Sequence, residues 1–340
     1  TQVIMTRVCI VGAGAIGSVI GGRLAHTGQA HVSALARGKT LASLRKHGWR
    51  LKLDGQIVSA PMAAYSTAAE LGPQDVVFIT VKGPALASIA PSLSPLLTEN
   101  TVIVPAMNGI PWWFCERIND LQGERLRSVD PDGSIAAAIP TDRVLGCVIH
   151  GSARQIEPGL VQETMWQQVI IGEPFGGSSA RVEDLVKLLA DAECKAVSSP
   201  DVRSEIWYKL WGNMTMNPVS ALTGATIDQI LADPLVREFC SAAMREAAEV
   251  GARLGCPIEQ TPEDRHEVTA KLGAFKTSML QDVEAGRQLE LDAIVTAVHE
   301  MARHLDLATP SIDALLGMTR LFGRVHGIYP RRENRRFYCV

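Results

Sequence analysis

The stretch Arg7-Val-Cys-Ile-Val-Gly-Ala-Gly-Ala-Ile-Gly17 decides the fold of this 340-residue chain. Its first five residues form a short apolar run, which is typical of a buried parallel strand. The glycines that follow have the spacing GxGxxG, a helix is predicted to run from Ser18 to His26, and a second strand from His31 to Ala36. This order of strand, glycine-rich turn, helix and strand predicts a dinucleotide-binding unit, which the glycine pattern alone would not.

Each glycine of the turn is expected to have its own task. We expect Gly12 to allow the tight turn, Gly14 to let the backbone approach a pyrophosphate, and Gly17 to let the helix pack closely on the strand. The N–H groups and partial positive charge at the helix N-terminus would then face the phosphates. The alternative is a glycine turn that serves packing alone. The residues predicted to bind the cofactor here are Gly12, Ala13, Gly14, Ala15, Ile16 and Gly17.

The end of the second predicted strand indicates which dinucleotide is bound. A site for NAD usually has an Asp or Glu there, which binds the ribose 2′-hydroxyl. This chain has Arg37, followed by Gly38 and Lys39. Because a cation suits a 2′-phosphate, the sequence favours NADP(H). The alternative is a solvated surface arginine.

Two more polar residues follow predicted strands. A buried strand is predicted from Asp75 to Val81 and leads into Lys82, and another from Thr101 to Pro105 precedes Asn108. Ligands of open α/β sheets bind outside the carboxyl ends of the strands. Lys82 is therefore expected to meet a cofactor phosphate or ribose, and Asn108 a nicotinamide ribose or a substrate oxygen. Asn108 could equally be a turn residue that tolerates a left-handed backbone.

Beyond Pro200 the sequence changes from alternating strands and helices to helices alone. Before that point the sequence predicts a hairpin at Trp49 to Val58 with Asp54-Gly55 as its turn. It also predicts antiparallel strands that extend the parallel sheet at Val144 to Gly172, and a helix at Ser179 to Ala190. After it, apolar residues recur at helical spacing in Leu235 to Leu254, Leu289 to Leu305 and Ser311 to Arg324. This pattern predicts an α/β class fold, with a doubly wound domain in residues 1–199 and an all-α domain in residues 200–340.

Composition argues against several classes of protein. The net charge of −3 argues against a nucleic-acid partner, and no apolar run approaches the length of a membrane span. The seven cysteines are scattered without a CxxC or Cys/His spacing, so we expect reduced thiols, a cytoplasmic location and no metal site. We also expect no signal peptide, and the basic run Arg331, Arg332, Arg335 and Arg336 to be a frayed tail.

The stretch Glu205-Ile-Trp-Tyr-Lys-Leu-Trp-Gly-Asn-Met-Thr-Met-Asn217 predicts a helix with one polar face. Lys209, Asn213 and Asn217 are four residues apart and fall along that face, between apolar neighbours. A polar stripe on an otherwise apolar helix is costly unless something polar meets it. We hypothesise that a small anionic substrate does so and that Lys209 gives it a proton. The alternative is a partly exposed helix whose lysine reaches water.

Three stretches together resemble the ketopantoate reductase family, also called 2-dehydropantoate 2-reductases, over most of the chain. They are the glycine turn at residues 12–17, Lys209-Leu-Trp-Gly-Asn-Met-Thr-Met-Asn-Pro218, and Ser278-Met-Leu-Gln-Asp282 with Glu290-Leu-Asp292 after it. The resemblance implies a Rossmann-type N-terminal domain, an all-α C-terminal domain and a substrate cleft between them. It also implies reduction of the 2-oxo group of ketopantoate by NADPH.

The resemblance also implies roles for single residues. It makes Lys209 the general acid, Glu290 an active-site carboxylate that could orient the Lys209 ammonium, and Ser278 a contact of the substrate carboxylate. It assigns cofactor contacts to Arg37, Lys82 and Asn108, and pocket positions to Asn213 and Asn217. For Ser278 a role as helix N-cap is the alternative.

Two departures from the family bear on the substrate. Where well-known members have asparagines near the distal end of the substrate, this chain has Phe275 and Ile227. The first alternative function is therefore reduction of another 2-oxo acid with a more apolar tail, and the second is an NADP(H)-binding sensor without turnover. A homodimer is possible, and the cluster Trp112-Trp113-Phe114 could serve a subunit contact or the core.

Overall fold

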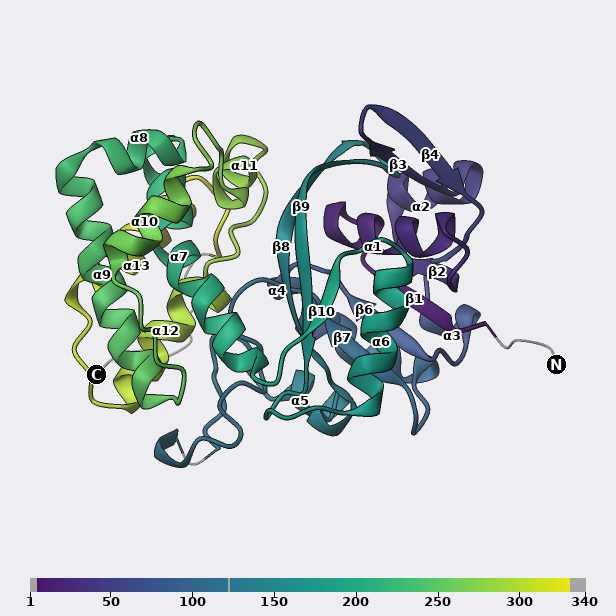
Figure 1. Ribbon diagram of the computed structural model, residues 1–340, viewed down its shortest axis with the longest axis horizontal. Helices are drawn as coiled ribbons and strands as arrows, with labels where there is room; N and C mark the ends of the chain where they lie inside the picture. Colours follow the sequence, from purple (N-terminus) through teal and green to yellow (C-terminus); the bar gives the residue numbers. More distant parts are fainter. Residues whose placement is uncertain (1–4, 122, 331–340) are drawn as a thin grey trace. The chain divides into compact units, whose positions relative to one another are not determined.

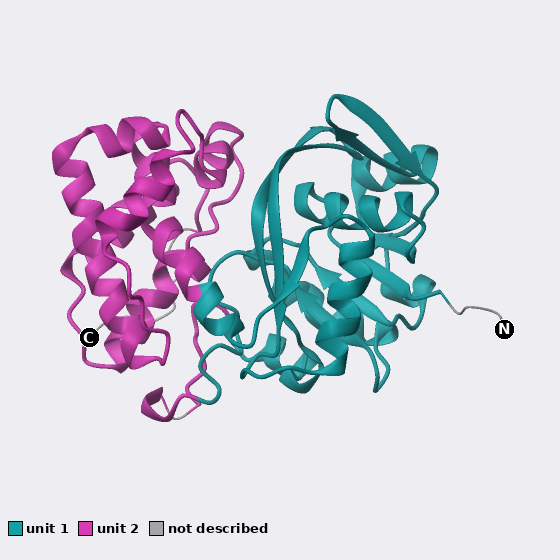
Figure 2. Ribbon diagram, in the orientation of Figure 1, with its two compact units in different colours: residues 1–117, 130–206 teal, residues 118–129, 207–340 magenta. Residues whose placement is uncertain are grey.

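The computed structural model describes residues 5–121 and 123–330, and they form two compact units (Figures 1 and 2). Unit 1 comprises residues 1–117 and 130–206, and unit 2 comprises residues 118–129 and 207–340. The change of unit falls inside one helix, α7 (Val202–Thr223). The basic run at Arg331, Arg332, Arg335 and Arg336 lies outside the described residues. The predicted cofactor and substrate domains, 1–199 and 200–340, stay a prediction.

Unit 1 contains a parallel sheet of five strands in the order β5-β2-β1-β6-β7. The strands are β1 (Arg7–Val11), β2 (His31–Leu35), β5 (Ala63–Tyr65), β6 (Val76–Ile79) and β7 (Val102–Pro105). Counted within this sheet the order is 3-2-1-4-5, which is the Rossmann arrangement with its reversal point beside the first strand. The predicted Rossmann-type fold is confirmed.

The apolar runs form strands because both faces of this sheet are covered. Val8, Cys9 and Ile10 of β1 have no exposed surface, and all four residues of β6 are buried. The helices of unit 1 are α1 (Ala15–His26), α2 (Gly38–His47), α3 (Ala68–Leu71), α4 (Gly83–Ile89), α5 (Ser134–Ala138) and α6 (Ala180–Asp191), with 3₁₀ turns at Ala90–Leu96 and Thr141–Arg143. The cluster Trp112-Trp113-Phe114 is buried in unit 1 and therefore belongs to its core.

A second sheet of unit 1 contains the antiparallel strands. Its strands are β3 (Trp49–Leu53), β4 (Gln56–Ala60), β8 (Gly146–Glu157), β9 (Leu160–Gly172) and β10 (Ala196–Ser198), in the order β10-β9-β3-β4 with β8 paired to β9. The hairpin predicted around Asp54-Gly55 is confirmed, with positive φ at both turn residues. The antiparallel pair β8 and β9 was expected to extend the parallel sheet. It forms this separate sheet instead, linked to the first by an isolated bridge between Ile103 and Val144.

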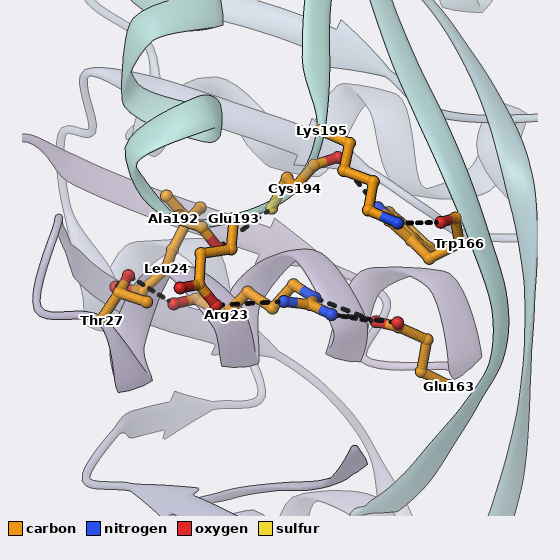
Figure 3. A network of polar contacts seen from close by, with 9 residues as sticks. All are labelled: Arg23, Leu24, Thr27, Glu163, Trp166, Ala192, Glu193, Cys194 and Lys195. Atoms are coloured by element: carbon orange, nitrogen blue, oxygen red, sulfur yellow. Dashed lines mark hydrogen bonds and ion pairs between the residues drawn. The ribbon is translucent and has the colours of Figure 1, made fainter. Parts of the chain in front are cut away.

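A polar network attaches helix α1 to the second sheet (Figure 3). Arg23 of α1 donates two-pronged hydrogen bonds to Glu163 of β9 at 2.8–3.0 Å, and the two side chains are 12% and 17% exposed. The Trp166 indole donates to the Cys194 carbonyl at 2.9 Å, and Lys195 Nζ donates to the Trp166 carbonyl at 2.9 Å. Charged, bidentate hydrogen bonds such as those between Arg23 and Glu163 are stronger than neutral ones, and these two side chains are largely buried. They fix the helix that follows the glycine turn.

Unit 2 is helical. After α7 its helices are α8 (Ile227–Ala232), α9 (Pro234–Arg253), α10 (Pro262–Ala270), α11 (Ser278–Glu284), the π-helix η4 (Asp292–Thr296), α12 (Ala297–His304) and α13 (Pro310–Val325). The helix predicted from Leu289 begins three residues later, and its first turn is a π-turn. Residues 118–129 belong to unit 2 because the Glu300 carboxylate accepts hydrogen bonds from the backbone N–H groups of Arg127 and Ser128. Within residues 5–121 and 123–330, every helix is too short or too polar to cross a membrane.

Candidate active site

The predicted cofactor residues of unit 1 gather at one edge of the parallel sheet. The strand register aligns Val11 with Leu35 on one side and with Ile79 on the other, and Ile79 with Pro105. These four residues end their strands, so the segments that follow start from one row. The glycine turn, Arg37, Lys82 and Asn108 come directly after them. This edge is where open α/β sheets bind their ligands.

The three glycines of the turn differ in what surrounds them. Gly12 has φ +91°, and an added Cβ would lie 2.8 Å from Val81 Cγ1. At Gly17 a Cβ would collide with Thr80 Oγ1 and lie 2.9 Å from Ile10 Cγ2. At Gly14 a Cβ would meet nothing within 4 Å, and its φ of −78° needs no glycine. Protein packing therefore explains Gly12 and Gly17, whereas the open space at Gly14 fits a ligand that approaches the backbone.

Thr80 is a residue of this turn that the sequence reading missed. Its hydroxyl lies within hydrogen-bond distance of the carbonyl oxygens of Val11 and Gly12, and it also packs against the position of Gly17. It follows β6, so one side chain ties two neighbouring strands and helix α1 together. A threonine after an apolar strand carries no signal for this role, because the role depends on a contact with residues about 70 positions away.

The N-termini of α1 and α2 both lack side-chain caps and acidic residues in the first turn. At α2 the N-cap is Arg37 and the first turn contains Lys39, and neither side chain makes a hydrogen bond or ion pair with any described residue. Cations at a helix N-terminus are unfavourable by roughly 0.3–1 kcal/mol each. An anion beside Arg37 would remove that cost. The backbone after Arg37 turns with a φ of +55° at residue 38, a conformation that favours the glycine found there.

Lys82 and Asn108 occupy the ends of the next two strands. Lys82 is the half-buried N-cap residue of α4, and Asn108 is exposed in the bend after β7. Gly109, with φ +85°, takes the left-handed backbone of that bend, whereas Asn108 has no positive φ. Tolerance of a left-handed backbone therefore does not account for Asn108, and its predicted contact with cofactor or substrate stays a prediction.

In unit 2, α7 carries Lys209, Asn213 and Asn217 along one helical face, as the spacing predicts. Lys209 and Asn213 are half-buried, and Asn217 is 5% exposed. The side-chain amides of Asn213 and Asn217 make no hydrogen bond with any described residue. An amide in a nearly buried position is stabilised by a polar partner that reaches it. These two amides are therefore suited to a polar small molecule.

A chain of buried hydroxyls places Ser278 beside the C-terminal half of α7. Ser220 Oγ donates to the Asn217 carbonyl at 2.8 Å and lies 2.5 Å from Thr277 Oγ1. Thr277 Oγ1 accepts from the Leu280 backbone N–H at 3.1 Å and caps α11. The alternative reading of Ser278 as the helix cap is therefore wrong. Ser278 is the first residue of α11, and its exposed side chain is left for another partner.

Glu290 lies between α11 and η4 in a stretch without helix or strand. It is half-buried between two apolar residues, Leu289 and Leu291, which are 1% and 0% exposed. The two buried leucines fix the backbone on both sides of the carboxylate. In the described parts of the chain, no group of three or more His, Cys, Asp or Glu side chains could hold a metal ion.

Comparison with known proteins identifies the family of the chain. Models of "Ketopantoate reductase PanE/ApbA" and of its C-terminal domain match residues 8–175 and 201–322. A 2-dehydropantoate 2-reductase from Mesorhizobium japonicum is 40% identical over 324 residues, which are 95% of this chain and 99% of that protein. The chain belongs to the ketopantoate reductase family.

Solved structures of ketopantoate reductase homologues share the fold over nearly the full length. One from Ralstonia solanacearum is 51% identical with a TM-score of 0.92, covering 96% of this chain and 100% of that one. The 2-dehydropantoate 2-reductase of Geobacter metallireducens is 25% identical with a TM-score of 0.81, covering 93% and 99%. As a ketopantoate reductase family member, the chain is an oxidoreductase of the 2-dehydropantoate 2-reductase type with a nicotinamide cofactor, NADP(H) in this family.

Phe275 and Ile227, the two departures from the ketopantoate reductase pattern, belong to one apolar cluster. The Ile227 backbone N–H donates to the Phe275 carbonyl at 3.0 Å, so the two residues lie side by side. Ile227 is 2% exposed, and Phe275 is a partly buried neighbour of the cluster that includes Met216 and Val219 of α7. Since Met216 adjoins Asn217, the polar face of α7 borders an apolar region.

Alanine substitutions should distinguish Gly17, which protein packing explains, from Gly14, which we expect to contact the cofactor. Gly17→Ala should lower the free energy of unfolding by about 2–3 kcal/mol, because its Cβ has no room beside Thr80. Gly14→Ala should cost less than about 1 kcal/mol of stability, as expected at an N-cap, and weaken NADPH binding at least about tenfold. Urea unfolding and NADPH titration measure the two effects. Unchanged NADPH affinity in Gly14→Ala would contradict the assignment of Gly14.

Proposed function

We propose that the chain reduces 2-dehydropantoate to pantoate with NADPH, as a step of pantothenate and coenzyme A biosynthesis. The observation that carries this proposal is the polar face of α7, where Lys209 is followed by two amides that lack partners among the described residues. The 40% identical 2-dehydropantoate 2-reductase supports the choice of substrate. A protein that merely sensed NADP(H) would need the glycine turn and not this face.

Lys209 acts as the general acid in the proposed reaction. Bound NADPH supplies the hydride. As the carbonyl oxygen of the substrate gains negative charge, the Lys209 ammonium stabilises that charge and then donates its proton to the oxygen. A positioned acid contributes roughly 10²–10⁴ in rate. Lys209 is half-buried on α7, so its ammonium has few neighbouring positions to occupy and can be held beside the carbonyl oxygen.

The other residues of unit 2 hold the substrate and the acid in place. Asn213 and Asn217 offer donors and acceptors without net charge, so they orient the 2-oxo acid and leave the charge balance at Lys209 unchanged. The exposed Ser278 hydroxyl, held near Asn217 by the capped start of α11, binds the substrate carboxylate. Glu290 orients the Lys209 ammonium and keeps it charged until the substrate is bound.

Arg37 selects NADPH over NADH. The cations of Arg37 and Lys39 at the uncapped start of α2 suit the charge of a 2′-phosphate, and they provide no acceptor for the proton of a 2′-hydroxyl. Arg37→Asp should therefore raise the KM for NADPH at least about tenfold more than the KM for NADH. Steady-state kinetics with both cofactors measures the ratio. The control is Lys46→Asp, which makes the same charge change at the other end of α2. An equal rise in both KM values would show that Arg37 does not read the 2′-phosphate.

A second candidate is reduction of another 2-oxo acid with a more apolar tail. The cluster formed by Phe275, Ile227 and their neighbours favours it, because neither side chain can pair the distal hydroxyl of 2-dehydropantoate. The loss of NADPH absorbance with a panel of 2-oxo acids decides between them. We expect the highest kcat/KM for 2-dehydropantoate. A higher value for a branched apolar acid would correct the substrate, and no turnover with any acid would favour a sensor.

Lys209→Ala should lower kcat by at least about 10²-fold. NADPH affinity should stay nearly intact, because the expected cofactor contacts lie in unit 1. The matched control is Lys271→Ala, which removes an exposed lysine of the same unit and should leave kcat unchanged. A kcat close to the wild-type value in Lys209→Ala would remove Lys209 from the chemistry.

A further inference from the structure

The stretch that carries Glu290 depends on another part of the chain for its shape. Residues 287–291 lie outside helices and strands, between the end of α11 and the π-helix η4. Near its start, the Arg287 backbone N–H donates to the Asp282 carbonyl at 2.8 Å, and the guanidinium pairs with the Asp282 carboxylate at 2.9 Å. These contacts close the turn after α11. They do not reach the residues next to Glu290.

The turn after α13 supplies the contacts on both sides of Glu290. The Leu289 backbone N–H, one residue before Glu290, donates to the Ile328 carbonyl at 2.8 Å. The Tyr329 hydroxyl donates at 2.7 Å to Oδ1 of Asp292, two residues after Glu290. Two consecutive residues of one turn thus hold the chain immediately before and after the carboxylate.

Gly323 of α13 contacts both the turn after α13 and the stretch that carries Glu290. Its carbonyl accepts the backbone N–H groups of Ile328 at 2.8 Å and Tyr329 at 3.1 Å, which folds the turn back onto α13. A Cβ at Gly323 would lie 2.6 Å from the Cβ of Tyr329 and 3.1 Å from Cδ1 of Leu289. The absence of a side chain at Gly323 therefore lets Tyr329 and the Glu290 stretch pack at the same place.

Asp292 links the tyrosine to the π-turn. Its Oδ1 also accepts the Thr296 hydroxyl at 2.9 Å, across the π-turn that begins at Asp292. Burial raises the pKa of the Asp292 carboxyl, and the two hydroxyl donors and the positive charge of Arg320 oppose that rise, while the charge of Glu300 adds to it. A partly buried acceptor with two donors restricts the positions of both partners. π-turns inside helices occur often at functional sites.

We propose that Tyr329 and Asp292 are positioning residues for Glu290. The inference rests on the proposed catalytic role of Glu290 and adds residues that touch neither substrate nor cofactor. Tyr329 fixes Asp292, Asp292 fixes the start of η4, and the backbone of Glu290 is thereby held at one place. A catalytic group that shifts by about 1 Å can lose much of its effect on the rate.

The test compares Tyr329→Phe with the wild-type chain in steady-state kinetics with NADPH and 2-dehydropantoate. Tyr329→Phe keeps the ring packed on Gly323 and removes the hydroxyl alone. We expect kcat to fall by roughly tenfold, the equivalent of one lost hydrogen bond, with the KM for NADPH unchanged. Asp292→Asn keeps an Oδ1 acceptor for both hydroxyls and should retain near wild-type kcat, whereas Asp292→Ala should match Tyr329→Phe.

A double-mutant cycle separates positioning from a general loss of stability. If Tyr329 acts through Glu290, Tyr329→Phe should have little further effect on kcat in a Glu290→Gln background. The control is Ser241→Ala, which removes a buried hydroxyl bonded to His266 at 2.9 Å in the same unit and should lower stability without lowering kcat.

The outcomes distinguish this inference from the function on which it rests. A tenfold effect of Tyr329→Phe that disappears beside Glu290→Gln supports positioning. Additive effects, or an unchanged kcat in Tyr329→Phe while Glu290→Gln is impaired, would overturn positioning and leave the proposed function standing. An unchanged kcat in Glu290→Gln would overturn the catalytic role of Glu290 and the positioning with it.

Discussion

The close approach of helix α1 to strands β1 and β6 is the constraint on which unit 1 depends. At Gly17 the helix lies against Ile10 and Thr80 with no room for a Cβ. That approach directs the first N–H groups of α1 over the sheet edge where the strands end. A longer distance would leave the fold recognisable and still move the N-terminus of α1 away from its ligand. The Arg23–Glu163 pair at the other half of α1 opposes such movement.

In unit 2 the corresponding constraint is the hydrogen bonding that holds the start of α11 against α7. The carbonyl of Asn217, the hydroxyls of Ser220 and Thr277, and the N–H of Leu280 form one continuous buried chain of hydrogen bonds. Each hydroxyl donates once and accepts once, so the chain is satisfied without charge. A satisfied buried network of this kind specifies one arrangement, because any shift leaves a polar atom without a partner. Ser278 directly follows Thr277, so this network also fixes the position of its backbone.

The sequence predicted the elements whose cause is local. Apolar runs gave the parallel strands, Asp54-Gly55 gave the hairpin, and the four-residue spacing placed Lys209, Asn213 and Asn217 on one face. It did not predict the second sheet, because the pairing of β3 with β9 joins residues about 110 positions apart. It offered Ser278 as the alternative cap of α11, whereas the cap is Thr277. Both residue types cap helices well, and the distant hydroxyl of Ser220 decides between them.

Chemistry and selectivity are assigned to different residues around the same helix. In the proposed reaction, the polar face of α7 acts on the 2-oxo acid group, which every candidate substrate shares. Next to it, Met216 and Val219 lead into the cluster of Phe275 and Ile227. A hydroxylated tail that reached this cluster without a partner would lose about 1–3 kcal/mol, and each buried methylene of an apolar tail would gain about 0.8 kcal/mol. If the proposal holds, the same face of α7 can serve substrates whose relative rates are set by the apolar neighbours of Asn217, and a change at Phe275 would alter selectivity without touching Lys209.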